Sequence, residues 1–173
     1  ISKGAEFDVR YLPEQLEGLT LQGGLVYAET QYDDFEAVDF FAPPRLPGST
    51  ISFAPRWSGT LAATYETSFI SDWDARFNVS SRFTSKYNTG SNLDPLKEVE
   101  ELVVVNARMS FYSDNSPFEL ELWAQNLFDE DYYELAFDTP LQGTAATQTA
   151  PGTAVGAFLS PPLTFGATAR VRF

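Results

Sequence analysis

The side chains of this sequence that could carry chemistry are carboxylates and guanidinium groups, because its 173 residues include no His and no Cys. Their absence excludes disulfides, zinc–thiolate sites, His-ligated metals, the Ser/His and Cys/His nucleophile pairs, and the commonest general base. Only an enzyme built from carboxylates would remain. We therefore predict that the chain is not an enzyme and holds no cofactor, and we assign no catalytic, cofactor-binding or metal-binding residue.

The charge balance bears on partners. Asp and Glu number 24 against 11 Lys and Arg, which gives a formal charge of −13. Because phosphate neutralisation needs a basic surface, nucleic acid is not an expected partner. The acidic run from Glu29 to Asp39 could hold Ca²⁺ through carboxylate oxygens, but it lacks the twelve-residue loop spacing and the fixed Gly of a calcium loop. We expect a solvated loop there, with calcium as the alternative.

Other charged residues recur at every second position of short segments. Between residues 73 and 87 the odd positions are mostly apolar and the even positions polar, and this period of two predicts a β-strand with one apolar and one wet face. If the apolar face meets lipid, a slip by one residue would bring Arg76, Arg82 and Lys86 to it, at roughly 2 to 4 kcal/mol for any of them near the midplane. The register is then strongly fixed.

The same alternation predicts six further strands of similar length. They cover residues 5–12, 19–27, 56–66, 103–112, 118–125 and 163–173. The connections alternate between short ones (13–18, 70–72 and 113–117) and long ones (33–53, 88–100 and 129–162). Short turns on a periplasmic rim and long loops on the other rim are typical of outer-membrane barrels, so we expect the C-terminus on the periplasmic side.

The fold class that this pattern predicts is all-β, an antiparallel up-and-down transmembrane β-barrel. No run of about 18 apolar residues marks a transmembrane helix, and 15% of the residues are aromatic, as expected where rings line two membrane interfaces. A soluble antiparallel sandwich is the alternative, because it also has alternating strands. It needs neither aromatic residues near both ends of its strands nor strictly alternating loop lengths.

Several stretches resemble, in order, the C-terminal region of TonB-dependent outer-membrane receptors. They are SKGAEFDVRYLP (2–13), GLTLQGGLVYAETQYDDF (18–35), LPGSTISFAPRWSGTLAATYE (46–66), NLFDEDYY (126–133) and PPLTFGATARVRF (161–173). The resemblance implies the last seven strands of a barrel of about 22 with a plugged lumen, the final strand being the signal for assembly. Residues 1–173 are then one barrel segment. The opening residues lack the features of a signal peptide, and we expect the plug domain and N-terminal strands to lie outside this sequence or on another chain.

The resemblance also implies partners: lipid and lipopolysaccharide, the plug and N-terminal strands, a TonB-type energising protein reached through the N-terminal part, and a small-molecule or glycan ligand. The implied function is active import of a scarce solute such as a ferric siderophore, cobalamin or an oligosaccharide. A small self-contained barrel with a structural or passive-channel role is the alternative. Ligand contacts would come from the plug and from loops 33–53, 88–100 and 129–162, but the substrate-binding residues are not identified.

The remaining candidate residues have bland interpretations. Asn126 and Asp129 are interpreted as strand-end and loop residues. We expect the charges on the wet face to form ion pairs between strands, with contact to plug and substrate as the alternative; they are Glu6, Asp8, Arg10, Arg56, Glu66, Asp74, Arg76, Arg82, Arg108, Glu119, Glu121, Arg170 and Arg172. We expect membrane-interface anchors at Tyr27, Trp57, Tyr65, Phe69, Trp73, Tyr87 and Phe111.

Overall fold

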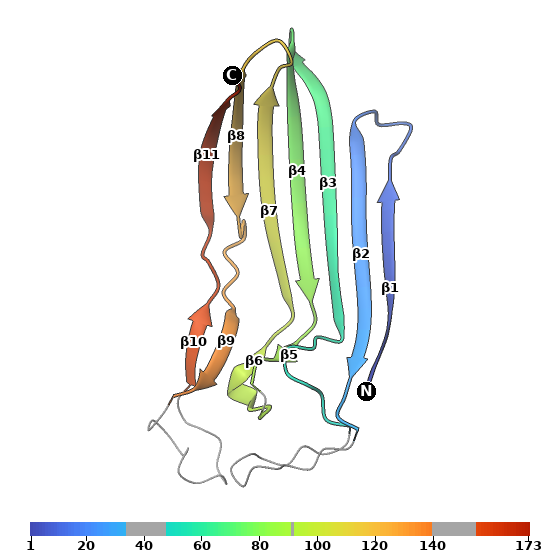
Figure 1. Ribbon diagram of the computed structural model, residues 1–173, viewed down its shortest axis with the longest axis vertical. Coiled ribbons are helices and arrows are strands. Elements are labelled where there is room, and N and C mark those ends of the chain that lie inside the picture. Colours follow the sequence, from blue (N-terminus) through green and yellow to red (C-terminus); the bar gives the residue numbers. More distant parts are fainter. Residues whose placement is uncertain (34–47, 91, 140–154) are drawn as a thin grey trace.

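The computed structural model describes residues 1–33, 48–90, 92–139 and 155–173, and its architecture is all-β. Seven long antiparallel strands form one sheet in the order β1-β2-β3-β4-β7-β8-β11 (Figure 1). They are β1 (Ser2–Tyr11), β2 (Leu19–Thr30), β3 (Trp57–Ile70), β4 (Trp73–Thr84), β7 (Leu102–Tyr112), β8 (Phe118–Gln125) and β11 (Thr164–Val171). Each long strand pairs with the next along the chain, so the predicted up-and-down order is confirmed.

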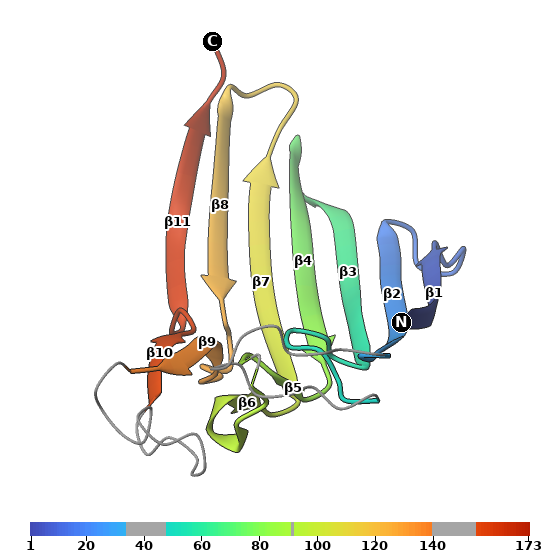
Figure 2. The ribbon, with the colours of Figure 1, turned by 60° about the horizontal axis from the view of Figure 1, so that its bottom comes forward.

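The sheet is open, with β1 and β11 as its edges. In the view of Figure 2, β11 is seen along its length while β1 is foreshortened, so the sheet twists and curves from one edge to the other. Its only helical element among the described residues is the 3₁₀ turn η1 (Pro95–Lys97). No helix in those parts of the chain is both long and apolar enough to cross a membrane.

The register carries the alternation of the sequence across the whole sheet. Phe77 of β4 lies opposite Tyr65 of β3 and Met109 of β7, and the next residue, Asn78, lies opposite Thr64 and Arg108. Because successive residues of a strand point to opposite faces, one face is apolar from β1 to β11 and the other is polar. The predicted register of each long strand is therefore the observed one.

The apolar face is largely exposed in the part of the chain that the structure describes. Leu61, Phe77, Leu122 and Phe165 are exposed by 61%, 38%, 39% and 78%, and no large side chain of the described residues is fully buried. A soluble sandwich would bury these side chains in a core shared by two sheets, and monomeric soluble proteins rarely expose so large an apolar surface. The sandwich alternative therefore does not describe this chain.

The three short connections lie at one end of the sheet, together with the C-terminus, and the described parts of the long connections lie at the other end (Figure 1). The first short turn ends at Gly18, whose carbonyl accepts a hydrogen bond from the backbone N–H of Glu66 in β3 (3.0 Å). Gly18 has φ +84, and a Cβ there would meet the carbonyl oxygen of Glu66. Only glycine fits this conformation and this close approach without strain.

Four short strands at the other end were not predicted: β5 (Tyr87–Asn88) pairs with β6 (Glu98–Val99), and β9 (Tyr133–Asp138) pairs with β10 (Val155–Leu159). The strand expected to reach Tyr87 ends at Thr84. Just beyond it, Trp57 donates its backbone N–H to the Ser85 hydroxyl (3.0 Å), and Ser85 donates its backbone N–H to the Trp57 carbonyl (2.8 Å). Tyr87 therefore belongs to the loop end and not to β4.

Candidate functional site

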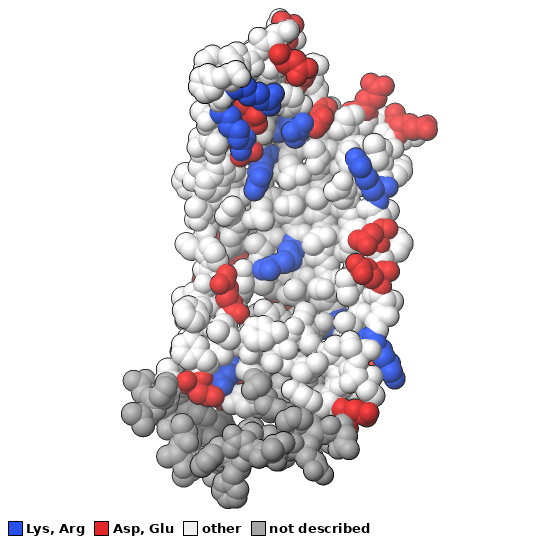
Figure 3. Space-filling model, viewed as in Figure 1, with Lys and Arg blue, Asp and Glu red and all other residues white. Residues whose placement is uncertain are grey.

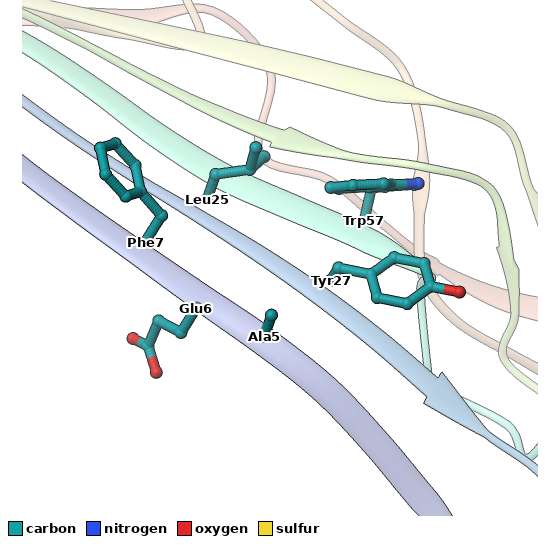
Figure 4. A pocket seen from close by; sticks show the side chains of 6 residues that line it. All are labelled: Ala5, Glu6, Phe7, Leu25, Tyr27 and Trp57. Carbon is teal, nitrogen blue, oxygen red and sulfur yellow. The ribbon is translucent and has the colours of Figure 1, made fainter.

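The apolar face carries aromatic pairs towards both ends. The rings of Tyr27 and Trp57 lie 4.8 Å apart at the loop end, and those of Phe69 and Phe111 lie 5.3 Å apart at the short-turn end. Beside the first pair an open hollow of about 340 Å³ is lined by Ala5, Glu6, Phe7, Leu25, Tyr27 and Trp57. In Figure 4 the Glu6 carboxylate points away from the four larger apolar side chains. The hollow is therefore an apolar surface suited to acyl chains.

Four of the seven ion pairs among the described residues lie at the short-turn end of the sheet, where charged residues gather in Figure 3. Glu66 and Arg76 are ladder partners, and Nε of Arg76 lies 2.6 Å from Oε1 of Glu66. Glu119 of β8 pairs in the same way with its ladder partner Arg170 of β11 (3.0 Å). Arg170 also reaches Glu121 (3.4 Å), and Arg172 reaches Glu119 (3.4 Å). The expected ion pairing between strands is present at this end.

Other charges of the polar face have no such partner. Among the residues that the structure describes, six of the predicted wet-face charges have no oppositely charged group within 4.0 Å; they are Glu6, Asp8, Arg10, Asp74, Arg82 and Arg108. Arg56, just before β3, pairs instead with Glu29 at the loop end (3.1 Å). The described part of the wall therefore has unpaired charges at several heights, with Asp74 near the short turns and Arg82 near the loop end.

At the loop end a buried lysine joins two connections. Nζ of Lys97 lies 2.6 Å from Oδ1 of Asp138 in β9 and 3.1 Å from Oδ1 of Asn92. The Lys97 side chain is 3% exposed, whereas that of Asp138 is 53% exposed. A Cβ on Gly90 would collide with Cδ of Lys97, so the glycine leaves room for the lysine stem. The 88–100 connection is thereby held against β9.

Thr89 makes the second link between these connections. Its hydroxyl accepts a hydrogen bond from the backbone N–H of Ala136 (3.1 Å) and lies within donating distance of the Lys97 carbonyl (3.0 Å). Thr89 is 4% exposed and Ala136 is 2% exposed. Buried polar groups need hydrogen-bond partners. The Thr89 hydroxyl therefore links the 88–100 connection to β9, although among the described residues no ladder of backbone hydrogen bonds joins them.

Residues 126–129 (NLFD) form a hydrogen-bond cluster that holds the described ends of the last long connection. The Asn126 side chain donates to the carbonyls of Glu130 and Pro161 (both 3.0 Å) and accepts from the Glu130 N–H (2.9 Å). Asp129 accepts from the Leu163 N–H (2.7 Å) just before β11. Asn126 and Asp129 have φ values of +50 and +55, a region that Asn and Asp tolerate better than most residues. Both residues therefore shape the strand end and the loop.

Close to this hydrogen-bond cluster, Tyr132 contacts the polar face of the sheet. Ser160 fixes the backbone of Tyr132, because the Tyr132 N–H donates to the Ser160 hydroxyl (3.2 Å) and the Ser160 N–H donates to the Tyr132 carbonyl (2.9 Å). Nη2 of Arg82 then donates to the Tyr132 hydroxyl (3.2 Å). Burial raises the pKa of nearby Tyr87, and Arg82 opposes that rise. Arg82 was predicted only as a wet-face charge, and its two phenolic neighbours were missed.

The candidate calcium loop lies only in part among the described residues. Within those ranges, no group of three or more Asp and Glu side chains is placed to hold a metal ion. Glu29 contacts Arg56 and accepts from the Gln31 side chain (3.2 Å). Residues 34–39 of the acidic run lie outside the described residues, as do 140–154 of the last long connection.

An open antiparallel sheet with one lipid-like face, one charged face and unequal rims is the wall of a transmembrane β-barrel. Residues 1–127 match the family described as TonB dependent receptor-like, beta-barrel. The chain therefore belongs to the TonB-dependent receptors, a family of outer-membrane transport receptors and not of enzymes. A search of curated proteins found no match to this sequence.

A solved structure supports the fold. The ferric yersiniabactin uptake receptor FyuA from Yersinia pestis aligns with a TM-score of 0.75 and 11% sequence identity, covering 99% of this chain and 23% of that receptor chain. At this identity the likeness concerns the fold alone. The chain spans less than a quarter of the receptor that it matches.

Proposed function

We propose that the complete receptor binds a scarce solute at the cell surface and imports it actively, without making or breaking a bond in it. The observation that carries the proposal is the two-faced sheet, whose apolar side suits lipid and whose charged side suits a water-filled interior. Membership of the family supplies the receptor class. The solute that we propose is a ferric siderophore, cobalamin or an oligosaccharide.

The proposal includes parts of the protein beyond this segment. Unpaired backbone groups at the edges of β1 and β11 would have no partners in hydrocarbon. We expect further N-terminal strands to close the barrel, a plug domain to fill it, and a TonB-type protein to energise it. The apolar face contacts lipid and lipopolysaccharide, the short turns and the C-terminus face the periplasm, and the long connections face the medium.

An uptake assay tests the function. Cells that lack the receptor gene and cells that carry it on a plasmid are given ⁵⁵Fe-labelled siderophores, labelled cobalamin and labelled oligosaccharides, with and without a protonophore. We expect receptor-dependent accumulation of one solute, abolished by the protonophore. Accumulation that survives the protonophore indicates the passive channel, and no receptor-dependent accumulation of any solute contradicts import.

A labelling experiment tests the orientation. This chain has no cysteine, so single cysteines can be placed at Leu96 beside η1, where the side chain is 47% exposed, and at Asn115 in an exposed short turn. On intact cells an impermeant maleimide should label Leu96→Cys and not Asn115→Cys, with the unsubstituted receptor as blank. The reverse pattern would invert the proposed topology.

A further inference from the structure

Arg82 differs from the other cations that meet a partner on the polar wall. Arg76, on the same strand and the same face, is paired with Glu66, and Arg170 and Arg172 are paired with glutamates of β8. Among the described residues, Arg82 donates only to the hydroxyl of Tyr132, and its Cζ lies 5.9 Å from the centre of that ring. A neutral phenol leaves the charge of a guanidinium uncompensated. A cation in this setting is ready to receive an anion.

The described side chain that accepts a hydrogen bond from Arg82 is a phenol and not a carboxylate. Burial holds the pKa of Tyr87 above its ordinary value, so this phenol is protonated at neutral pH. Tyr132 is placed by its two backbone hydrogen bonds to Ser160, a residue that is 8% exposed. Glu134 is a nearby acid whose charge also raises the pKa of Tyr87, but among the described residues it does not come within 4.0 Å of the Arg82 guanidinium.

Space for a ligand lies beside this group. Arg82 is the ladder partner of Thr60, and Thr60 lines a hollow of about 380 Å³ in the wall together with Asp8, Arg10, Gln22, Gly24 and Ala62. The hollow depends on small residues, because a Cβ on Gly24 would lie 2.8 Å from the Asp8 carboxylate. A ligand that enters from the loop end can therefore rest on the wall with one group against Arg82.

We propose that Arg82 and Tyr132, with Tyr87 beside them, form a subsite that binds a carboxylate group of the imported solute. The guanidinium offers two parallel N–H donors to a carboxylate, and the Tyr132 hydroxyl offers a third. One cation with neutral phenols suits a single negative charge better than a doubly charged phosphate. The proposal rests on the import function and adds the chemical class of the ligand.

A binding experiment with small probes tests the subsite without knowledge of the solute. The purified full-length receptor is titrated with 4-fluorobenzoate and with the neutral 4-fluorobenzamide, and ¹⁹F relaxation measures binding. We expect the benzoate to bind and the benzamide not to bind. Arg82→Gln should weaken benzoate binding roughly tenfold to a hundredfold, and Tyr132→Phe roughly fivefold. Arg82→Lys should fall between these two, because it keeps the charge and loses the planar fork.

Arg76→Gln is the matched control, because it removes the same charge from the same strand and face. It should leave benzoate binding unchanged, which separates the subsite from the general charge of the wall. Equal losses in Arg76→Gln and Arg82→Gln, or no benzoate binding by the unsubstituted receptor, would overturn the assignment. If the unsubstituted receptor does not bind benzoate, an acidic side chain elsewhere in the protein already pairs with Arg82. Because the assay does not involve uptake, its failure is distinct from failure of the transport proposal.

Discussion

At the short-turn end of the sheet, charged groups find partners on the neighbouring strand, whereas at the loop end buried polar groups find partners far away in sequence. Glu66 and Arg76 are ladder partners, and both side chains are 47% exposed. Thr89 and Ala136 are 47 residues apart, and both are buried. The first arrangement follows from strand register alone. The second needs two long connections to fold onto each other.

The difference has an energetic consequence. Exposed ion pairs contribute little, typically less than about 1 kcal/mol, because water competes for both charges. A buried polar group that loses its partner costs the full desolvation penalty, roughly 1 to 3 kcal/mol for each group. Substitutions at the loop end should therefore destabilise the protein more than substitutions at the ion pairs, although most of the formal charge contacts lie at the other end.

Asn126→Ala should have the largest effect. It removes three side-chain hydrogen bonds from a residue that is 5% exposed and places Ala at φ +50. We expect the amides of residues 126–138 to lose roughly 3 to 4 kcal/mol of opening free energy, measured in the full receptor by hydrogen exchange and mass spectrometry. Asn126→Gly isolates the hydrogen bonds, because glycine adopts the same φ without strain. Unchanged hydrogen exchange in both variants would contradict the stabilising role of the Asn126 hydrogen bonds.

Thr89→Val should come next, because it keeps the shape of the side chain and removes the hydroxyl. The Ala136 N–H and the Lys97 carbonyl would each lose a partner inside a buried contact. We expect a loss of about 2 kcal/mol at the amides of β9 in the same exchange experiment. Thr89→Ser keeps the hydroxyl and should retain most of the protection. A valine variant as stable as the serine variant would mean that shape, and not hydrogen bonding, joins the connections.

Lys97→Met should cost less, about 1 to 2 kcal/mol. Removing one member of a buried ion pair is severe when the other charge stays buried, but Asp138 is 53% exposed and water can hydrate it. Methionine also keeps the stem that lies against Gly90. Exchange at β6 and β9 should speed up together, since Lys97 joins them. Faster exchange at β6 alone would show that the two connections open independently.

The contrast between the ends also explains what the sequence could predict. The seven long strands, their order and their two faces follow from a period of two, because each strand is long enough to repeat the pattern several times. The two-residue strands β5 and β6 are too short to show any period. The unpredicted contacts, Thr89 to Ala136 and Arg82 to Tyr132, join residues 47 and 50 positions apart. No local signal encodes which loop residues will meet across such separations.

The smallest effect is expected for Arg76→Gln at the short-turn end. Its pair with Glu66 is half exposed, and its Cζ also lies 4.9 Å from the centre of the Tyr112 ring. We expect less than about 1 kcal/mol of lost opening free energy at the β3–β4 amides. Combining it with Glu66→Gln should give a coupling energy of similar size, and that coupling should shrink further in high salt because the charges are exposed. A larger, salt-independent coupling would mean that the pair is shielded from water in the complete receptor. The plug would then cover the short-turn end of the polar face. The polar groups at both ends of the sheet would be buried, by the plug at one end and by the long connections at the other.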